Sequence, residues 1–166
     1  MEKDAENRKD NFMELDQTDK KLLGLLEEDA TMTIKQLAAH LNLTVTPVHE
    51  RVKKLKKAGI IEAVQAKINR HKIGLSMMVI CEVTMDSHTK ESIQLFESEI
   101  AKLDEVKECL HVSGVHDYML KVVLTDMDSY RDFIMNKLSK IKGVVNVNSS
   151  FVLHELERKQ YFAVKA

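Results

Sequence analysis

The spacing of the apolar residues changes once along this chain of 166 residues, at Ser76, and that change constrains the fold most. Before Ser76 the apolar residues recur every three or four positions, which is typical of amphipathic helices. After it, apolar and polar residues alternate in short runs separated by helical stretches. The pattern therefore predicts a small helical domain followed by an α+β domain. With 44% hydrophobic and 31% charged residues, the chain should fold.

The N-terminal half predicts three short helices. Asp16 and Asp19 suit the start of the first helix, which we expect to end near Asp29. Thr33 and Gln36 form a capping box that begins the second helix. Since the connections between these helices are short, they indicate a helix-turn-helix.

The single proline of the chain marks the start of the third helix. Pro47 fits a first helical turn, where its missing N–H has no partner in any case. Proline also disfavours the helical conformation at the preceding residue, so Thr46 is the better N-cap and Thr44 the alternative. Gly59 suits the end of this helix.

The third helix also carries a cluster of positive charge. Residues 31–75 contain nine basic and two acidic residues, whereas the whole chain has a net charge of −1. Such a segment indicates an anionic partner, and a short basic helix fits the major groove of double-stranded DNA. The alternative is a solvated charged surface. The residues that we expect at the DNA are Thr44, Thr46, Pro47, His49, Arg51, Lys53, Lys54 and Lys56.

Two kinds of DNA contact are expected from these side chains. The guanidinium of Arg51 can donate two parallel hydrogen bonds, so Arg51 is the candidate for reading a guanine. The lysines, with Lys57, suit phosphate oxygens. We expect Arg51→Ala to weaken specific DNA binding by about 1–3 kcal/mol and to leave the oligomer intact.

The C-terminal half repeats one pattern. Residues 76–113 predict a strand, a helix and a strand, and residues 118–153 predict the same again. Two such units give a ferredoxin-like βαββαβ fold, a four-stranded antiparallel sheet with both helices on one face. The face without helices would expose apolar side chains, so we expect it to form a two-fold dimer. These side chains are Met78, Ile80, Met119, Val123 and Val152.

The sequence resembles the Lrp/AsnC (feast/famine) family of prokaryotic transcription regulators over almost its whole length. The resemblance of the N-terminal part rests on Leu15-Asp16-x-x-Asp19, Ile34-x-x-Leu37-Ala38, Thr46-Pro47-Val48-x-Glu50-Arg51-Val52-x-x-Leu55 and Ala58-Gly59-Ile60-Ile61. The C-terminal part is similar to the family's effector-binding domain through Gly114-Val115-His116-Asp117-Tyr118. Thr44 departs from the family, which more usually has serine there, but keeps the hydroxyl group.

The resemblance implies a division of the chain. We expect a mobile tail over residues 1–14, a winged-helix-like helix-turn-helix domain over 15–60, a linker with a short strand over 61–75, and a ferredoxin-like effector-binding and oligomerisation domain over 76–166. It also implies a sequence-specific regulator that forms dimers and octamers and responds to a small molecule such as an amino acid. The implied effector-binding residues are Gly114, Val115, His116, Asp117, Tyr118, Ser149 and Ser150.

The residues of this loop allow two interpretations. Gly114 permits a ligand to approach the backbone closely, and Asp117 could pair with an α-amino group. In the other interpretation the loop is an ordinary tight connection in which Asp117 caps a turn.

Several classes of protein are excluded by what the sequence lacks. No apolar run is long enough to cross a membrane, and the polar N-terminus does not fit a secretory signal. Two cysteines without zinc-ligand spacing indicate a protein of the reducing cytoplasm, with neither metal nor cofactor. Since catalytic motifs are missing, we expect no enzyme. The alternatives are an enzyme with a similar fold, such as a haem-precursor decarboxylase, and a metabolite-sensing module without DNA binding.

Overall fold

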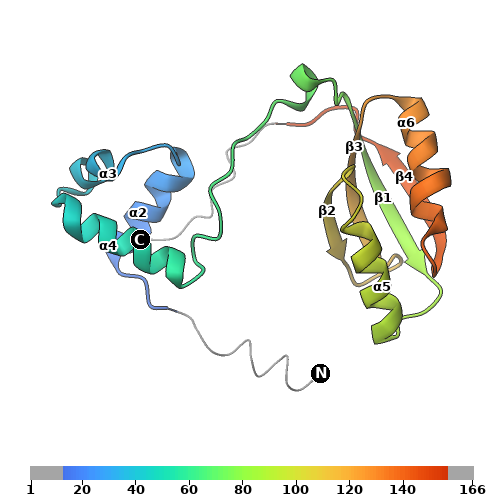
Figure 1. Ribbon diagram of the computed structural model, residues 1–166, viewed down its shortest axis with the longest axis horizontal. Coiled ribbons are helices and arrows are strands. Elements are labelled where there is room, and N and C mark those ends of the chain that lie inside the picture. The colour runs from blue at the N-terminus through green and yellow to red at the C-terminus, as the bar shows by residue number, and fades with distance from the viewer. Residues whose placement is uncertain (1–12, 157–166) are drawn as a thin grey trace. The chain divides into compact units, whose positions relative to one another are not determined.

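The computed structural model describes residues 13–156, which divide between Ala66 and Lys67 into an N-terminal and a C-terminal unit (Figure 1). The expected mobile tail, residues 1–14, lies almost entirely outside the described residues. Within the described part, no helix combines the length and the apolar character that crossing a membrane requires.

The described part of the N-terminal unit contains three helices, α2 (Gln17–Glu28), α3 (Ile34–Leu41) and α4 (Val45–Lys57). The caps of α2 and α3 are confirmed: the Asp16 carboxylate accepts a hydrogen bond from the Asp19 N–H at 2.7 Å, and Thr33 and Gln36 form a capping box. The three helices surround one small hydrophobic core, which consists of Leu22, Leu37, Ala38, Val48, Val52 and Leu55.

The start of α4 differs from the prediction. Thr44 is the N-cap residue, although its side chain makes no capping hydrogen bond, and Thr46 is already helical. Pro47 is therefore the third helical residue instead of the first. The first four N–H groups of any helix lack partners within that helix, so proline is tolerated there as well. At the other end, Gly59 adopts a φ of 70° after the last helical turn, as expected of a helix-ending glycine.

The expected short strand in the linker is absent. Residues 61–69 are irregular, and a 3₁₀-helix, η1 (Arg70–Ile73), follows them. An extended segment becomes a strand only when a neighbouring backbone supplies hydrogen bonds, and no described strand pairs with these residues.

The described residues of the C-terminal unit form one four-stranded antiparallel sheet. Its strands are β1 (Met77–Met85), β2 (Val106–His111), β3 (Tyr118–Leu124) and β4 (Val144–Phe151), in the order β2-β3-β1-β4. The helices are α5 (Lys90–Ile100) and α6 (Met127–Asp132), and α6 continues as a π-helical turn, η2 (Phe133–Lys137), and a 3₁₀ turn, η3 (Leu138–Lys140). This arrangement confirms the ferredoxin-like fold.

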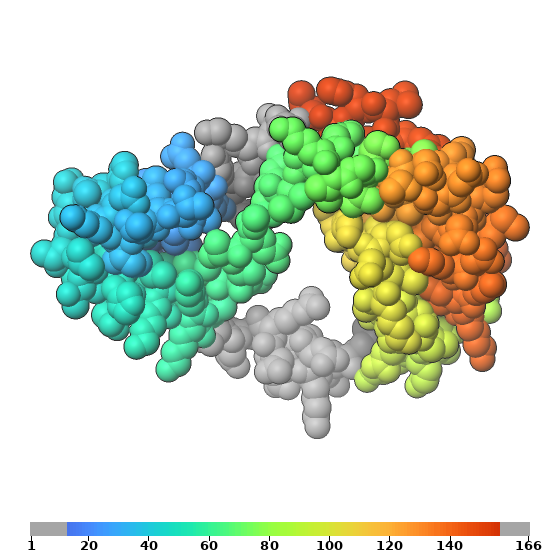
Figure 2. Space-filling model, turned by 45° about the horizontal axis from the view of Figure 1, so that its top comes forward, coloured from blue at the N-terminus to red at the C-terminus, as the bar shows by residue number. Residues whose placement is uncertain are grey.

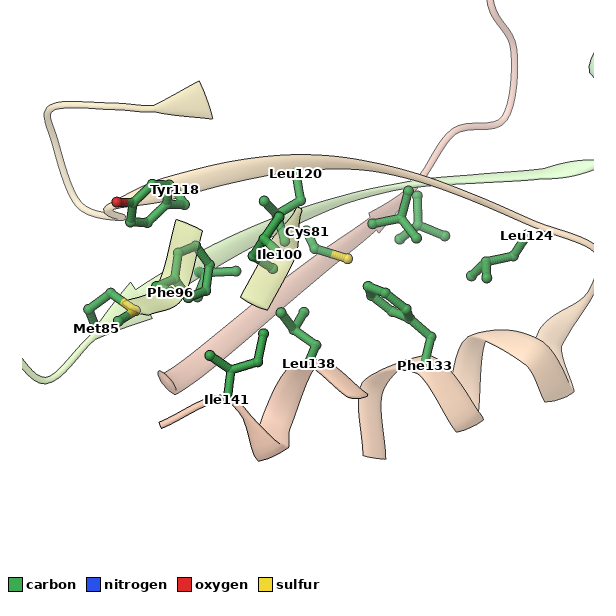
Figure 3. Close-up of a cluster of buried hydrophobic side chains, with 13 residues drawn as sticks. Cys81, Met85, Phe96, Ile100, Tyr118, Leu120, Leu124, Phe133, Leu138 and Ile141 are labelled. Atoms are coloured by element: carbon green, nitrogen blue, oxygen red, sulfur yellow. The ribbon is translucent and has the colours of Figure 1, made fainter. Parts of the chain in front are cut away.

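Both helices pack on the same face of the sheet. Phe96 and Ile100 of α5, together with Phe133 and Leu138, point toward the strands, where Leu120 is fully buried (Figure 3). This core shares no residue with that of the N-terminal unit.

The face of the sheet opposite the helices is less open than the sequence suggests. Met78 and Val123 are only 6% and 5% exposed within a single chain. Ile80, Met119 and Val152 are half-buried. The apolar surface available to a second copy is therefore smaller than expected and lies around the last three residues.

Candidate functional site

Helix α4 presents a basic surface because its apolar residues fix which side faces inward. Val48, Val52 and Leu55 are buried, so the residues between them must point away from the core. Thr46, Lys53 and Lys57 lie opposite the buried side at spacings of seven and four residues, and all three are exposed. The other expected contact residues that are exposed are Thr44, Pro47, His49, Lys54 and Lys56.

The charges on this surface are mostly uncompensated. His49 lies 3.5 Å from Glu50, and both side chains are well exposed. Among the described residues, none forms an ion pair with Lys53, Lys54, Lys56 or Lys57. The helix therefore offers four ammonium groups to an anionic partner.

Arg51 is the exception on α4, and its expected role needs correction. One guanidinium nitrogen lies 2.6 Å from a carboxylate oxygen of Asp16 and 2.6 Å from one of Asp19. The Asp19 side chain is only 4% exposed, so withdrawing the cation would leave a buried carboxylate without its partner. Arg51 therefore joins α4 to the start of α2 and is not poised to read a guanine.

This ion pair also affects the acidity of the first helix cap. The pKa of Asp16 lies below its ordinary value because its carboxylate accepts the N–H of Asp19 and is paired with Arg51. Asp16 thus keeps its negative charge at the start of α2, where the charge interacts favourably with the helix dipole.

The second candidate site is the loop between β2 and β3. Gly114 has a φ of 147°, and the space where a Cβ would stand is open. Val115 is 87% exposed. The ends of the loop are fixed, since the Val112 N–H donates to the Asp117 carbonyl and the Asp117 N–H donates to that of Val83, both at 2.9 Å. The tip of the loop at Gly114 and Val115 is thus exposed, while its two ends are held by backbone hydrogen bonds.

The carboxylate of Asp117 is already bound within the unit. It accepts the Met85 N–H at 2.7 Å and lies 2.6 Å from His88 Nε2. These contacts, the first one most, lower the pKa of Asp117 below its ordinary value. The structure thus supports the interpretation in which Asp117 fixes the loop.

His116 lies over the sheet face that carries no helix. Its Nδ1 is 3.2 Å from the Thr84 hydroxyl, and its Nε2 is 3.5 Å from a carboxylate oxygen of Glu82. Glu82 also accepts a hydrogen bond of 2.8 Å from Asn148. These partners of His116 were not predicted, because Thr84 and Glu82 lie more than thirty residues earlier in the chain and no local pattern joins them to the loop.

The remaining residues implied by the resemblance lie apart from the loop. Tyr118 is 1% exposed, packs against Phe96 and donates a hydrogen bond to Glu97 at 3.2 Å. Its side chain therefore belongs to the hydrophobic core, and the expectation that it contacts the effector needs correction. Ser149 and Ser150 pair with Cys81 and Ile80. That register is several residues away from the end of β1 at which the loop is anchored. Among the described residues, no hydrogen bond or ion pair joins either serine to the loop, although Glu82, which contacts His116, lies next to Cys81 in β1.

The geometry therefore defines a protein with a basic helix-turn-helix and a separate α+β unit, and comparisons with known proteins agree. Residues 15–62 match the family described as winged helix-turn-helix DNA-binding. Residues 78–161 match the Lrp/AsnC ligand binding domain.

Similar proteins cover nearly the whole chain. The leucine-responsive regulatory protein of Klebsiella pneumoniae is 30% identical over 161 residues, which are 97% of this chain and 98% of that protein. A transcriptional regulator of Neisseria meningitidis, solved as an L-Met complex, is 30% identical with a TM-score of 0.82, covering 87% of this chain and 94% of that one. An AsnC family regulator of Agrobacterium tumefaciens is 28% identical with a TM-score of 0.83, covering 89% and 96%.

The chain belongs to the Lrp/AsnC family. It is a transcriptional regulator that combines a DNA-binding helix-turn-helix with a domain for a small-molecule effector.

Proposed function

We propose that α4 enters the major groove and that its exposed lysines, 53, 54, 56 and 57, bind phosphates on either side. The observation that carries this proposal is the orientation of α4, in which Val48, Val52 and Leu55 face the core and the lysines face outward without ion pairs among the described residues. Thr46 and His49 lie on the exposed side of the first turns, so they are the candidates for base contacts.

The effector proposed here is a small amino acid. Gly114 and Val115 offer an exposed backbone that a carboxylate can approach, and the Neisseria regulator of similar fold is an L-Met complex. His116 and the exposed Ser150 are further candidates for ligand contacts. Because no hydrogen bond or ion pair joins Ser150 to the loop within one chain, we place the complete site between chains.

Assembly is proposed as a dimer through the sheet face around Ile80 and Met119, with octamers formed from such dimers. A two-fold dimer places two α4 helices on half-sites separated by about one helical turn or a multiple of it. The protein would act in the cytoplasm, on chromosomal DNA. It would regulate without catalysing a reaction, since its basic residues gather on α4 and not around the loop.

The DNA contact is tested with Lys53→Ala, and Lys90→Ala on α5 is the matched control because it removes the same charge from the other unit. A gel shift uses DNA from upstream of the gene and random DNA at several salt concentrations. Lys53→Ala should weaken binding to both DNAs and reduce the slope of log K against log salt by about one. If the full-length protein shows no preference for the upstream DNA at moderate salt, the proposal is wrong.

The effector is tested by thermal unfolding of the full chain with each of the twenty amino acids. A ligand that binds only the folded protein raises the unfolding temperature in a concentration-dependent manner. Gly114→Val should abolish that increase for the amino acid concerned, because the β-branched side chain fills the approach to the backbone and disfavours a φ of 147°. A flat screen would contradict the amino-acid effector while leaving the DNA contact intact.

A further inference from the structure

A groove of about 470 Å³ lies between α5 and the end of the α6 segment, by which we mean α6 with the turns η2 and η3 that continue it. Figure 2 shows the surface of these two elements, α5 in yellow-green to yellow and the α6 segment in orange. Leu95, Leu103 and Ile141 form the apolar part of the groove. The polar lining residues are Glu99, Asn136, Lys137, Lys140 and Lys142.

The basic side of the groove lies on an irregular stretch of backbone. After α6 the chain passes through the π-helical turn η2 and the 3₁₀ turn η3, so the helical pitch changes twice within eight residues. Lys137 ends the first turn and Lys140 the second, and Lys142 lies two residues after Lys140. π-helical turns are rare and are often found at functional sites.

The lining carries an excess of positive charge that the unit does not neutralise. Glu99 is paired with Lys102 at 2.6 Å, and Lys137 is paired with Glu105. Among the residues that the structure describes, Lys140 donates only to the uncharged Asn136 side chain, at 3.2 Å. Lys142 is exposed and forms no ion pair with any described residue. Two ammonium groups at one rim are thus available to an anion.

We propose that this groove binds an amphipathic anion. Its acidic head group lies between Lys140 and Lys142, and its short apolar chain lies on Leu95, Leu103 and Ile141. The volume falls within the range of about 300–1,000 Å³ that is typical of small-molecule sites. Leu95 is 41% exposed, so the chain of the ligand would cover apolar surface that faces water in the free protein.

This site shares no residue with the loop at Gly114 or with α4. It therefore goes beyond the proposed function and does not depend on it.

The test uses the full-length protein and calorimetric titration with octanoate below its micelle-forming concentration. Octyl phosphate carries the other common acidic head, and octylamine is the cationic control of equal chain length. Octanoate or octyl phosphate should bind saturably, and the tighter one identifies the head group. Octylamine should not bind. Equal binding of octylamine, or no saturable binding of either anion, would overturn the proposal.

Two variants separate the groove from the rest of the surface. Lys140→Gln/Lys142→Gln removes both free charges, and Lys90→Gln/Lys107→Gln removes two exposed charges elsewhere in the same unit. The first variant should bind the anion about tenfold more weakly, and the second should bind it like the original protein. Equal affinity of both variants would overturn the site. So would a first variant that changes the sedimentation coefficient without ligand, because the groove would then be a contact between copies.

Binding of DNA and of the amino acid is measured on the same variants. Both should be unchanged in Lys140→Gln/Lys142→Gln. A failure of the groove is thereby distinguished from a failure of the proposed function.

Discussion

Arg51 shows how one side chain changes role when its surroundings are known. In the sequence it stands among lysines and suggests a base contact. In the structure it links α4 to two carboxylates that lie 32 and 35 residues earlier in the chain. The recognition surface that we propose therefore consists of threonine, histidine and lysine, while the arginine joins α4 to the start of α2.

Arg51→Ala should destabilise the N-terminal unit by about 2 kcal/mol, because a buried Asp19 loses its charged hydrogen-bond donor. Urea unfolding measures this loss. Lys54→Ala, an exposed lysine on the same helix, should change the free energy of unfolding by less than about 0.5 kcal/mol. If Arg51→Ala unfolds like the original protein but loses specific DNA binding, the guanine-reading role is restored.

Asp117 gives a pH dependence with a defined sign. Its pKa is lowered in the folded protein from an ordinary value of 3.8, so the unfolded chain binds a proton more readily. The stabilisation by Asp117 is therefore complete above pH 3.8 and is lost as the pH falls through the lower, folded pKa.

Asp117→Asn should lack this acid-dependent component while keeping an acceptor for the Met85 N–H. Asp117→Ala removes the acceptor as well and should cost about 1–3 kcal/mol. Unfolding as a function of pH, with hydrogen exchange of the Met85 amide, distinguishes the two variants. Equal acid sensitivity of Asp117→Asn and the original protein would contradict this assignment.

At the scale of elements, contacts between residues close in the sequence could be predicted, whereas contacts between distant residues could not. The caps at Asp16 and Thr33 could be predicted because their partners lie three residues away. The strands could be predicted because apolar and polar residues alternate. The predicted start of α4 was wrong because two threonines near the proline are both suitable N-cap residues. The partners of Asp117 and His116 could not be predicted, since they lie about thirty residues away on β1 and after it.

Two glycines in contrasting places allow a matched test. Gly24 lies inside α2 with open space around its missing Cβ, so Gly24→Ala should stabilise the N-terminal unit by about 0.5–1 kcal/mol. Gly143 has a φ of 95°, and a Cβ there would stand 3.0 Å from the Met85 side chain. Gly143→Ala should destabilise the C-terminal unit by about 1–2 kcal/mol, mainly through backbone strain.

Thermal unfolding followed by circular dichroism measures both glycine variants. Opposite shifts of the unfolding temperature are expected. Shifts of the same sign would contradict the backbone conformation described for one of the two positions.

For the molecule as a whole, the repeat of strand, helix and strand made the fold of the C-terminal unit predictable, whereas the extent of its exposed apolar surface was not. The burial of Met78 and Val123 within one chain could not be predicted from the alternation of apolar and polar residues, which only assigns them to the face without helices. The remaining apolar residues on that face, Ile80 and Met119, are the ones that should meet a second copy.

Met119→Glu should weaken self-association by about a hundredfold, because a carboxylate would have to be buried without a partner. Analytical ultracentrifugation measures the change, and Lys90→Glu on α5 introduces the same group away from the sheet face. DNA binding should weaken together with dimerisation, since two half-sites need two copies of α4. A Met119→Glu protein that remains dimeric would show that the two-fold contact lies elsewhere.

The two hydrophobic cores have no member in common, and this has a consequence for how such a regulator can diversify. A substitution that retunes operator preference need not disturb metabolite sensing, and the reverse also holds, because each half has a hydrophobic core of its own. Exchanging one half for that of a relative should therefore yield a working chimera. By recombination within the linker, evolution can join an existing effector domain to a DNA-binding domain that recognises different genes.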